Sequence, residues 1–243
     1  MVVRHRHEGN DMSESILERI ARRAAAAGAR IVLPEASDAR VLHAARRITD
    51  RNLARVVLLG SPDDVRARAG EEDLDLSDVD VLDPQTDPDR DAYVSALHAK
   101  RKAKGMTRDD AEARLAHPVY YGGMMVGAGA VDGMVAGSAS PTADTVRSAL
   151  YGVGTAPGCK TVSGGSLMQT IVPQMGEEGA LIFADTGVVP APTVEQLADI
   201  AIGAAELCRA LLDVPPRVAM LSFSTKGSAK SEAVRRVVEA TAL

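Results

Sequence analysis

Short apolar runs alternate with longer amphipathic segments along most of the chain. The runs at 31–33, 56–59, 79–82 and 134–136 have the length expected of short buried strands. Between most of them, apolar residues recur every three or four positions, as they do on one face of a helix. Strands that alternate with helices predict an α/β fold with a mostly parallel sheet and helices on both of its faces.

Capping residues mark where several of these helices begin. Ser15 and Glu18 are spaced as a capping box, and Gly28 fits the end of the helix that they begin. Ser61 followed by Pro62 predicts another start, because serine caps well and proline suits the first helical position. Similar signals predict further helices that begin near Asp38, Asp89, Thr107, Pro141 and Thr193.

The alternation breaks at 156–165, where Gly, Pro, Ser and Thr replace the periodic apolar residues. Such a composition is typical of a boundary between domains, so we expect one domain at 13–158 and a second at 159–243. Within the second domain, the apolar runs at 181–184 and 217–223 predict two more strands, each followed by a helix.

Composition narrows the classes of partner. The chain carries a net charge of -5 and is 2% aromatic, so neither nucleic acid nor an anionic membrane surface is an expected ligand. No apolar run reaches the roughly 18 residues of a membrane span. Residues 1–12 are polar and predict a disordered extension rather than a secretory signal. Cys159 and Cys208 lack metal or redox spacing, which favours reduced thiols and a cytoplasmic protein.

The segment 224–231, Ser-Thr-Lys-Gly-Ser-Ala-Lys-Ser, carries the clearest functional signal. A loop of small residues between a strand and a helix N-terminus can bind phosphate through backbone N–H groups and the helix dipole. We expect the helix to begin near residue 228. The spacing is not that of a Walker A loop, and the alternative is a polar loop with a capping serine. The candidate ligands are Ser224, Thr225, Lys226, Gly227, Ser228 and Lys230.

A second group of candidates follows the expected strand at 134–136. Ser138 and Thr142 would lie at the carboxyl edge of the sheet, where open α/β folds bind ligands. Arg147 falls in the helix after them, and Arg101 belongs to a basic cluster. Guanidinium groups hold phosphate by paired hydrogen bonds, although for Arg101 a solvated helix end is the alternative. The glycines at 122–123 are better explained by tight packing.

Other catalytic arrangements lack support in the sequence. The histidines at 43, 98 and 117 do not share the spacing of metal ligands, so no metal site is expected. Cys159 has no histidine nearby in sequence that would activate it. The glycine spacings of a dinucleotide fingerprint and of a nucleophile elbow are absent as well.

Taken together, several blocks of the sequence resemble the phosphate acetyltransferase/butyryltransferase family. The blocks are Arg30–Glu35, His117–Met125, Val131–Gly137, Phe183–Asp185 and Leu221–Ser231. They follow one another in the family's order and cover about 15–243. The resemblance implies two α/β domains with the active site in the cleft between them, and a homodimer.

The resemblance also implies a reaction. The thiolate of coenzyme A attacks the carbonyl carbon of acetyl phosphate, and inorganic phosphate leaves, without a metal or another cofactor. Arg101 and Arg147 match arginines that are implicated in binding coenzyme A and acetyl phosphate, and the 224–231 loop fits the phosphate side of the cleft. Coenzyme A or acetyl-CoA, acetyl phosphate and phosphate are therefore the expected partners.

The sequence departs from the family at its C-terminal end. Members normally continue beyond this point with a Ser-Arg pair and an Asp, proposed to stabilise the transition state and to act as the base. We therefore expect an incomplete second domain with exposed apolar surface, and a chain that is weakly active or inactive.

Two alternatives stay open. One is a phosphate butyryltransferase, although the blocks at 142–147 and 224–231 favour acetyl. The other is a non-catalytic acetyl-CoA-binding module, like the related domains that occur fused to malic enzymes. No malic-enzyme domain precedes this one, which counts against that alternative.

Overall fold

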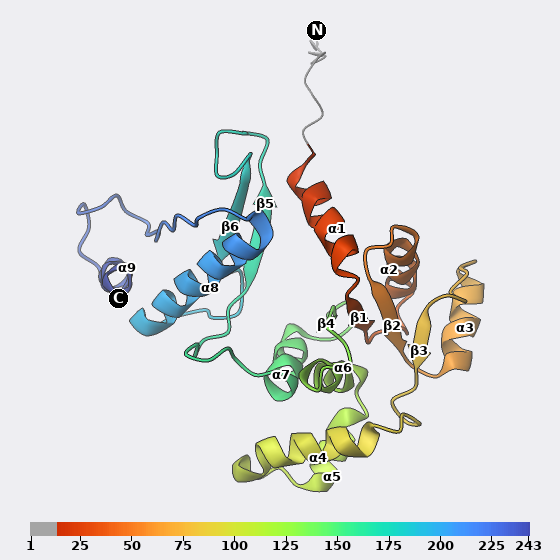
Figure 1. Cartoon of the computed structure of the whole chain (residues 1–243). Coiled ribbons are helices and arrows are strands. Elements are labelled where there is room, and N and C mark those ends of the chain that lie inside the picture. The colour runs from red at the N-terminus through yellow and green to blue at the C-terminus, as the bar shows by residue number, and fades with distance from the viewer. Residues whose placement is uncertain (1–13) are drawn as a thin grey trace, which may run out of the picture. The chain divides into compact units, whose positions relative to one another are not determined.

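The computed structural model describes residues 14–243, which fall into two compact units (Figure 1). One unit is formed by residues 21–154, and the other by residues 155–243 together with residues 14–20. The extension expected at 1–12 lies outside the described residues. The domain limits at 13–158 and 159–243 stay a prediction.

The 21–154 unit is built on a four-stranded parallel sheet in the order β3–β2–β1–β4. Val32 lies opposite both Val57 and Met134, which fixes the register of the three neighbouring strands. The four predicted strands are confirmed, except that β4 is shorter and begins one residue earlier than expected. The strands are β1 (Arg30–Leu33), β2 (Arg55–Leu59), β3 (Asp80–Leu82) and β4 (Gly133–Met134).

Helices connect these strands, and their first residues follow the capping signals. The side chains of Asp38, Ser61 and Thr107 each accept a hydrogen bond from a backbone N–H of the helix that they begin. The helices are α1 (Ile16–Ala27), α2 (Ala39–Asp50), α3 (Pro62–Glu71), α4 (Arg90–Arg101), the 3₁₀ turn η1 (Lys102–Lys104), α5 (Arg108–Leu115), α6 (Pro118–Gly127) and α7 (Thr142–Gly152).

Both faces of the parallel sheet are covered. Because side chains alternate along a strand, Val57 and Leu59 pack with residues of α4, α5 and α6, whereas Leu58 packs with residues of α2 and α3. Each face has its own cluster of fully buried apolar side chains. The predicted α/β layering is therefore confirmed in this unit.

Glycines let α6 approach its neighbours closely. A Cβ atom at Gly122 would lie 2.9 Å from the Met134 sulfur on the sheet, and one at Gly123 would lie 2.7 Å from the Ser148 carbonyl oxygen of α7. Gly152 of α7 approaches the Gly123 backbone in the same way. The prediction of tight packing at 122–123 is confirmed, and this packing brings the side chains of α6 and α7 together.

The second unit contains β5 (Gly165–Gln169), β6 (Ala180–Ala184), α8 (Val194–Leu212) and α9 (Glu232–Ala242). The predicted helix start at Thr193 is confirmed, and Thr193 caps α8 with a complete capping box. The fully buried apolar cluster here is small and consists of Ile16, Ala180 and Leu212.

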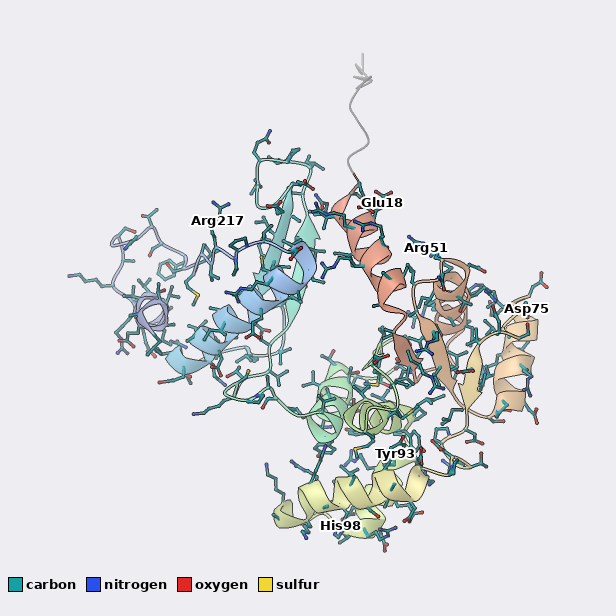
Figure 2. All side chains as sticks on the ribbon, in the orientation of Figure 1. Glu18, Arg51, Asp75, Tyr93, His98 and Arg217 are labelled. Atoms are coloured by element: carbon teal, nitrogen blue, oxygen red, sulfur yellow. The ribbon has the colours of Figure 1, made fainter. Side chains whose placement is uncertain are left out.

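Three predictions for this unit are wrong. β5 and β6 pair antiparallel, and β5 was not expected because it follows a Gly-rich stretch. The run at 217–223 is extended but is not a strand, since no ladder partner lies beside it among the described residues; Arg217 marks this segment in Figure 2. The last helix begins after Ser231, three residues later than expected, because Ser231 rather than Ser228 caps it.

Candidate functional site

A cavity of about 570 Å³ lies within the 21–154 unit, between η1, α5, α6 and α7. Its lining includes three basic side chains, Arg101, Lys104 and Arg114, and two acidic ones, Asp110 and Asp144. Asp110 already binds the N–H and hydroxyl of Thr107 in the cap of α5. The cavity is therefore an open, polar pocket with an excess of positive charge.

Arg101 enters this pocket from the end of α4. Its guanidinium carbon lies 4.5 Å from the centre of the Tyr151 ring, a cation–π contact that holds the planar group in place. The Nε atom of Arg101 is buried and has no hydrogen-bond partner. A buried, unpaired donor on a charged group costs free energy, so this guanidinium is suited to an anionic or carbonyl oxygen.

Tyr120 of α6 lies at the centre of a hydrogen-bonded group that extends to α7. Its buried hydroxyl donates to Asp144 Oδ1 at 2.7 Å and accepts from Arg147 Nη1 at 3.2 Å. Arg147 Nη1 also binds Asp144 Oδ1 at 2.8 Å. Arg147 is not in the wall of the cavity, but both of its partners are.

The same ring organises two more side chains. Arg114 places its guanidinium carbon 5.0 Å from the centre of the Tyr120 ring, and His117 meets that ring edge-on at 5.8 Å. Tyr151 also contacts Tyr120, with ring centres 5.8 Å apart. The two arginines predicted from sequence are thus joined through two tyrosines, from Arg101 to Tyr151, Tyr120 and Arg147.

Charge and hydrogen bonding both favour the charged forms of Asp144 and Arg147. The hydrogen bond from Tyr120 lowers the pKa of Asp144 against the opposing effect of burial, and the charge of Arg147 lowers it further. The bond to Tyr120 and the charge of Asp144 raise the pKa of Arg147. Asp144 is therefore ionised and Arg147 cationic at neutral pH.

Ser138 lies at the carboxyl edge of the sheet, as predicted, but its donors are engaged by a protein group. Glu35 follows β1, and its carboxylate accepts the Ser138 N–H and hydroxyl at 2.9 and 3.1 Å. Backbone N–H groups of Gly137, Ala139 and Ser140 also donate to Glu35. Burial alone would raise the pKa of Glu35, but these hydrogen bonds lower it to about 2.

The remaining candidates occupy two places. Thr142 is exposed in the first turn of α7, near Ser138 in sequence. The 224–231 loop belongs to the other unit, where Ser228 donates to the Thr225 carbonyl oxygen at 2.8 Å and Gly227 adopts a φ of +84°. Lys226 and Lys230 are exposed. Substrate binding by Ser138, Thr142 and this loop stays a prediction.

Other classes of site find no support in the part of the chain that the structure describes. Within residues 14–243, no three His, Cys, Asp or Glu side chains gather as metal ligands would. Over the same residues, no helix has both the length and the apolar character that crossing a membrane requires.

Sequence reasoning missed Tyr120, Tyr151 and Arg114. A usable signal was present, because the chain has only four tyrosines and all of them fall between residues 93 and 151. Two line the cavity, while Tyr93 and Tyr121 meet edge-to-face at 5.3 Å in the core. Rings that are scarce elsewhere and gather in one unit mark the region worth searching.

Comparison with known proteins identifies the family. A profile described as phosphate acetyl/butaryl transferase matches residues 15–243. The chain belongs to this family. It is 43% identical over 231 residues to a phosphate acetyltransferase of Acetivibrio thermocellus, and 45% identical over 213 residues to one of Clostridium acetobutylicum. These matches cover 94% and 87% of this chain but 68% and 63% of the relatives.

Solved structures agree with this membership. A phosphotransacetylase from Streptococcus pyogenes superposes with a TM-score of 0.84 at 36% identity, and the EutD phosphotransacetylase from Staphylococcus aureus with 0.80 at 36% identity. Each match covers 93% of this chain, and 67% and 66% of those chains respectively. The chain thus spans about two thirds of the length of these four relatives.

Proposed function

We propose that this chain binds coenzyme A and acetyl phosphate for the phosphate acetyltransferase reaction, acetyl-CoA + phosphate ⇌ coenzyme A + acetyl phosphate. In the direction of acetyl-CoA synthesis, the thiolate sulfur attacks the carbonyl carbon and a C–S bond forms. The C–O bond to phosphate then breaks, and phosphate leaves with the electron pair. The thiol proton passes to a base or to solvent.

The observation that carries this proposal is the unpaired Arg101 guanidinium in a positively charged cavity. Both substrates are anionic, and the guanidinium of an arginine in a cavity wall can hold a phosphate or a carbonyl oxygen by paired hydrogen bonds. Arg147 is the second cation assigned to substrate, with Thr142 and the 224–231 loop as further ligands. Ser138 would join them only by exchanging a hydrogen bond to Glu35 for one to substrate. Neither a metal nor a separate cofactor is part of the proposal.

The names of the relatives support an acetyl substrate. The curated relatives compared above are phosphate acetyltransferases, an acyltransferase class, which favours acetyl over the butyryl alternative. A homodimer and a cytoplasmic location are proposed on the family resemblance and on the two cysteines, which are free in the structure.

The test combines turnover with binding. Phosphate-dependent release of coenzyme A from acetyl-CoA is measured for the 243-residue chain, with the Acetivibrio thermocellus enzyme as positive control. Coenzyme A binding is measured by calorimetry on the same chain and on Arg101→Ala, which should weaken binding about ten- to a hundredfold. The matched control is Arg46→Ala, because Arg46 of α2 pairs with Asp50 and Asp78, outside the cavity.

The outcomes separate the alternatives. Binding with turnover supports an acetyltransferase. Tight binding without turnover fits both the acetyl-CoA-binding module and the weakly active or inactive acetyltransferase expected above, and turnover by a version extended to the length of the relatives would separate the two. A chain that binds neither coenzyme A nor acetyl phosphate would contradict the proposal. Faster turnover with butyryl than with acetyl phosphate would replace the acetyl assignment by the butyryl one.

A further inference from the structure

We propose that Tyr120 is a positioning residue, which holds the Arg147 guanidinium in one orientation and ties it to the wall of the Arg101 cavity. This inference rests on the proposed function, because it assigns how one of the two proposed substrate-binding arginines is aimed. The observations that carry it are the contacts of one buried hydroxyl and one buried ring.

The Tyr120 hydroxyl acts both as a hydrogen-bond donor and as an acceptor. It donates its one hydrogen to Asp144 Oδ1, and its oxygen accepts from Arg147 Nη1 at 3.2 Å and, in a longer contact, from Arg114 Nη1 at 3.5 Å. Asp144 in turn accepts from the same Nη1. Nη1 is held by the Tyr120 and Asp144 oxygens, which are hydrogen-bonded to each other. The guanidinium therefore has little freedom to rotate, although the Arg147 side chain is 44% exposed.

The backbone beneath this group leaves it little freedom to move. Tyr120 belongs to α6, and Asp144 and Arg147 belong to α7. The two helices meet at Gly123, Gly127 and Gly152 with room for no further Cβ atom. Tyr120 is 2% exposed, and its ring is in contact with Arg114, His117 and Tyr151. The close helix contact thereby sets where the guanidinium of Arg147 lies.

Only part of the Arg147 guanidinium is used by this arrangement. Nη1 is bound to protein, and Arg147 shows no further hydrogen bond among the described contacts. A guanidinium has five N–H donors, so the others can bind a substrate oxygen while Nη1 stays anchored. Tyr120 therefore aims Arg147 without competing for the donors that a substrate needs.

The chain offers a matched control at the next residue. Tyr121 is also buried, and its hydroxyl also donates to a carboxylate at 2.7 Å, but that carboxylate is Asp87, which does not line the cavity. Tyr120→Phe and Tyr121→Phe each remove one such bond and keep the ring. A loss of affinity due to general destabilisation should appear in both variants, and one due to positioning only in the first.

Coenzyme A affinity is the first readout, measured by calorimetry on the whole chain at fixed salt. Tyr120→Phe should weaken binding about fivefold or more, whereas Tyr121→Phe should leave it unchanged. In an Arg114→Ala background, which removes the longer contact to the hydroxyl, Tyr120→Phe should still weaken binding. In an Arg147→Ala background it should have little further effect, since the hydroxyl acts through Arg147. Equal losses in the two tyrosine variants, or losses at Tyr120 and Arg147 that simply add, would overturn the proposal.

The second readout needs no substrate. Phenylglyoxal modifies accessible arginines, and the rate at Arg147 can be followed by peptide mass spectrometry. Release of Nη1 in Tyr120→Phe should raise that rate severalfold, with no change in Tyr121→Phe. An unchanged rate in Tyr120→Phe would contradict the positioning role. A raised rate in a chain that fails to bind coenzyme A would support the positioning role and contradict the proposed function instead.

Discussion

The two units of this chain bury their apolar side chains to very different extents. In the 21–154 unit, Leu42, Leu58, Leu97 and Leu115 are fully buried on the two faces of a parallel sheet. In the 155–243 unit, Phe223 is 75% exposed. A two-stranded sheet offers one ladder and few neighbours, so the apolar residues around it have little to pack against.

Similar local sequence signals led to different structures in the two units. The runs at 56–59 and 217–223 both predict a strand, but only the first has neighbours on both sides. An apolar groove of about 900 Å³, lined by residues of β6, α8 and the 214–221 segment, lies in the second unit. Local pattern therefore establishes a strand only where the rest of the fold supplies a partner.

The largest expected difference between the units is in hydrogen exchange. Amides of β1 and β2 lie in a central ladder beneath buried side chains, whereas those at 217–223 have no ladder partner. We expect the 217–223 amides to exchange about a thousandfold faster than the β1 and β2 amides, measured by mass spectrometry. Comparable protection in the two segments would show that the contrast in packing does not extend to stability.

Truncating an apolar side chain to alanine should lower the free energy of unfolding by several kcal/mol more in the 21–154 unit than in the second unit. Leu58→Ala should lower the free energy of unfolding by about 2–5 kcal/mol, because Leu58 is fully buried. The matched variant Leu221→Ala should change it by less than about 0.5 kcal/mol, because Leu221 is 77% exposed.

Tyrosine fluorescence measures the effect of Leu58→Ala and shows whether Leu221→Ala is felt in the 21–154 unit. The effect of Leu221→Ala on its own unit is measured by circular dichroism in the far ultraviolet. All four tyrosines belong to the 21–154 unit and the chain has no tryptophan, so a urea titration followed by tyrosine fluorescence reports that unit alone. A shift of the tyrosine-detected midpoint in Leu221→Ala similar to that in Leu58→Ala would mean that the two units unfold together.

The smallest expected difference in stability is between the loss of two carboxylates, one in each unit, that accept hydrogen bonds from loop N–H groups. Glu35 accepts hydrogen bonds from the 137–140 loop, and Asp185 accepts from the N–H groups of Gly164, Val188 and Val189. Glu35→Gln should cost about 1.5–3 kcal/mol, and Asp185→Asn less, because Asp185 accepts from fewer donors and its unit has the smaller core.

The pH dependence of stability tests the Glu35 interaction further. The pKa of Glu35 is about 2 in the folded chain, below the ordinary value of 4.5. Its contribution should therefore be complete above pH 4.5 and should be lost as the pH falls from 4.5 toward 2. Thermal unfolding of wild type and Glu35→Gln across this range should converge at low pH; parallel curves would contradict the assignment.

The sequence was sufficient for features that depend on local pattern. The strands at 31–33 and 56–59 and the caps at Asp38 and Thr107 are confirmed because each follows from neighbouring residues. The glycines at 122–123 predicted close packing there, but not which helix they contact. β5 could not be predicted, because Gly165–Gln169 has a single aliphatic branched residue and becomes a strand only by pairing with β6.

The candidate site was accessible from sequence only in part. Arg101 was identified, and the structure places it in the cavity. The link from Tyr120 to Asp144 was not, since 24 residues separate them and only the packing of α6 on α7 brings them within hydrogen-bond distance. The internal ligand Glu35 was missed for the same reason, because 103 residues separate it from Ser138.

The Glu35 carboxylate has a consequence for how this protein depends on its surroundings. If the N–H groups of the 137–140 loop were satisfied by a bound phosphate ion, the order of the loop would depend on phosphate concentration. Here the anion at the end of β1 is part of the chain, so it is present at the same effective concentration in every molecule. The loop before α7 is thus set during folding, and its order does not follow the metabolic state of the cell.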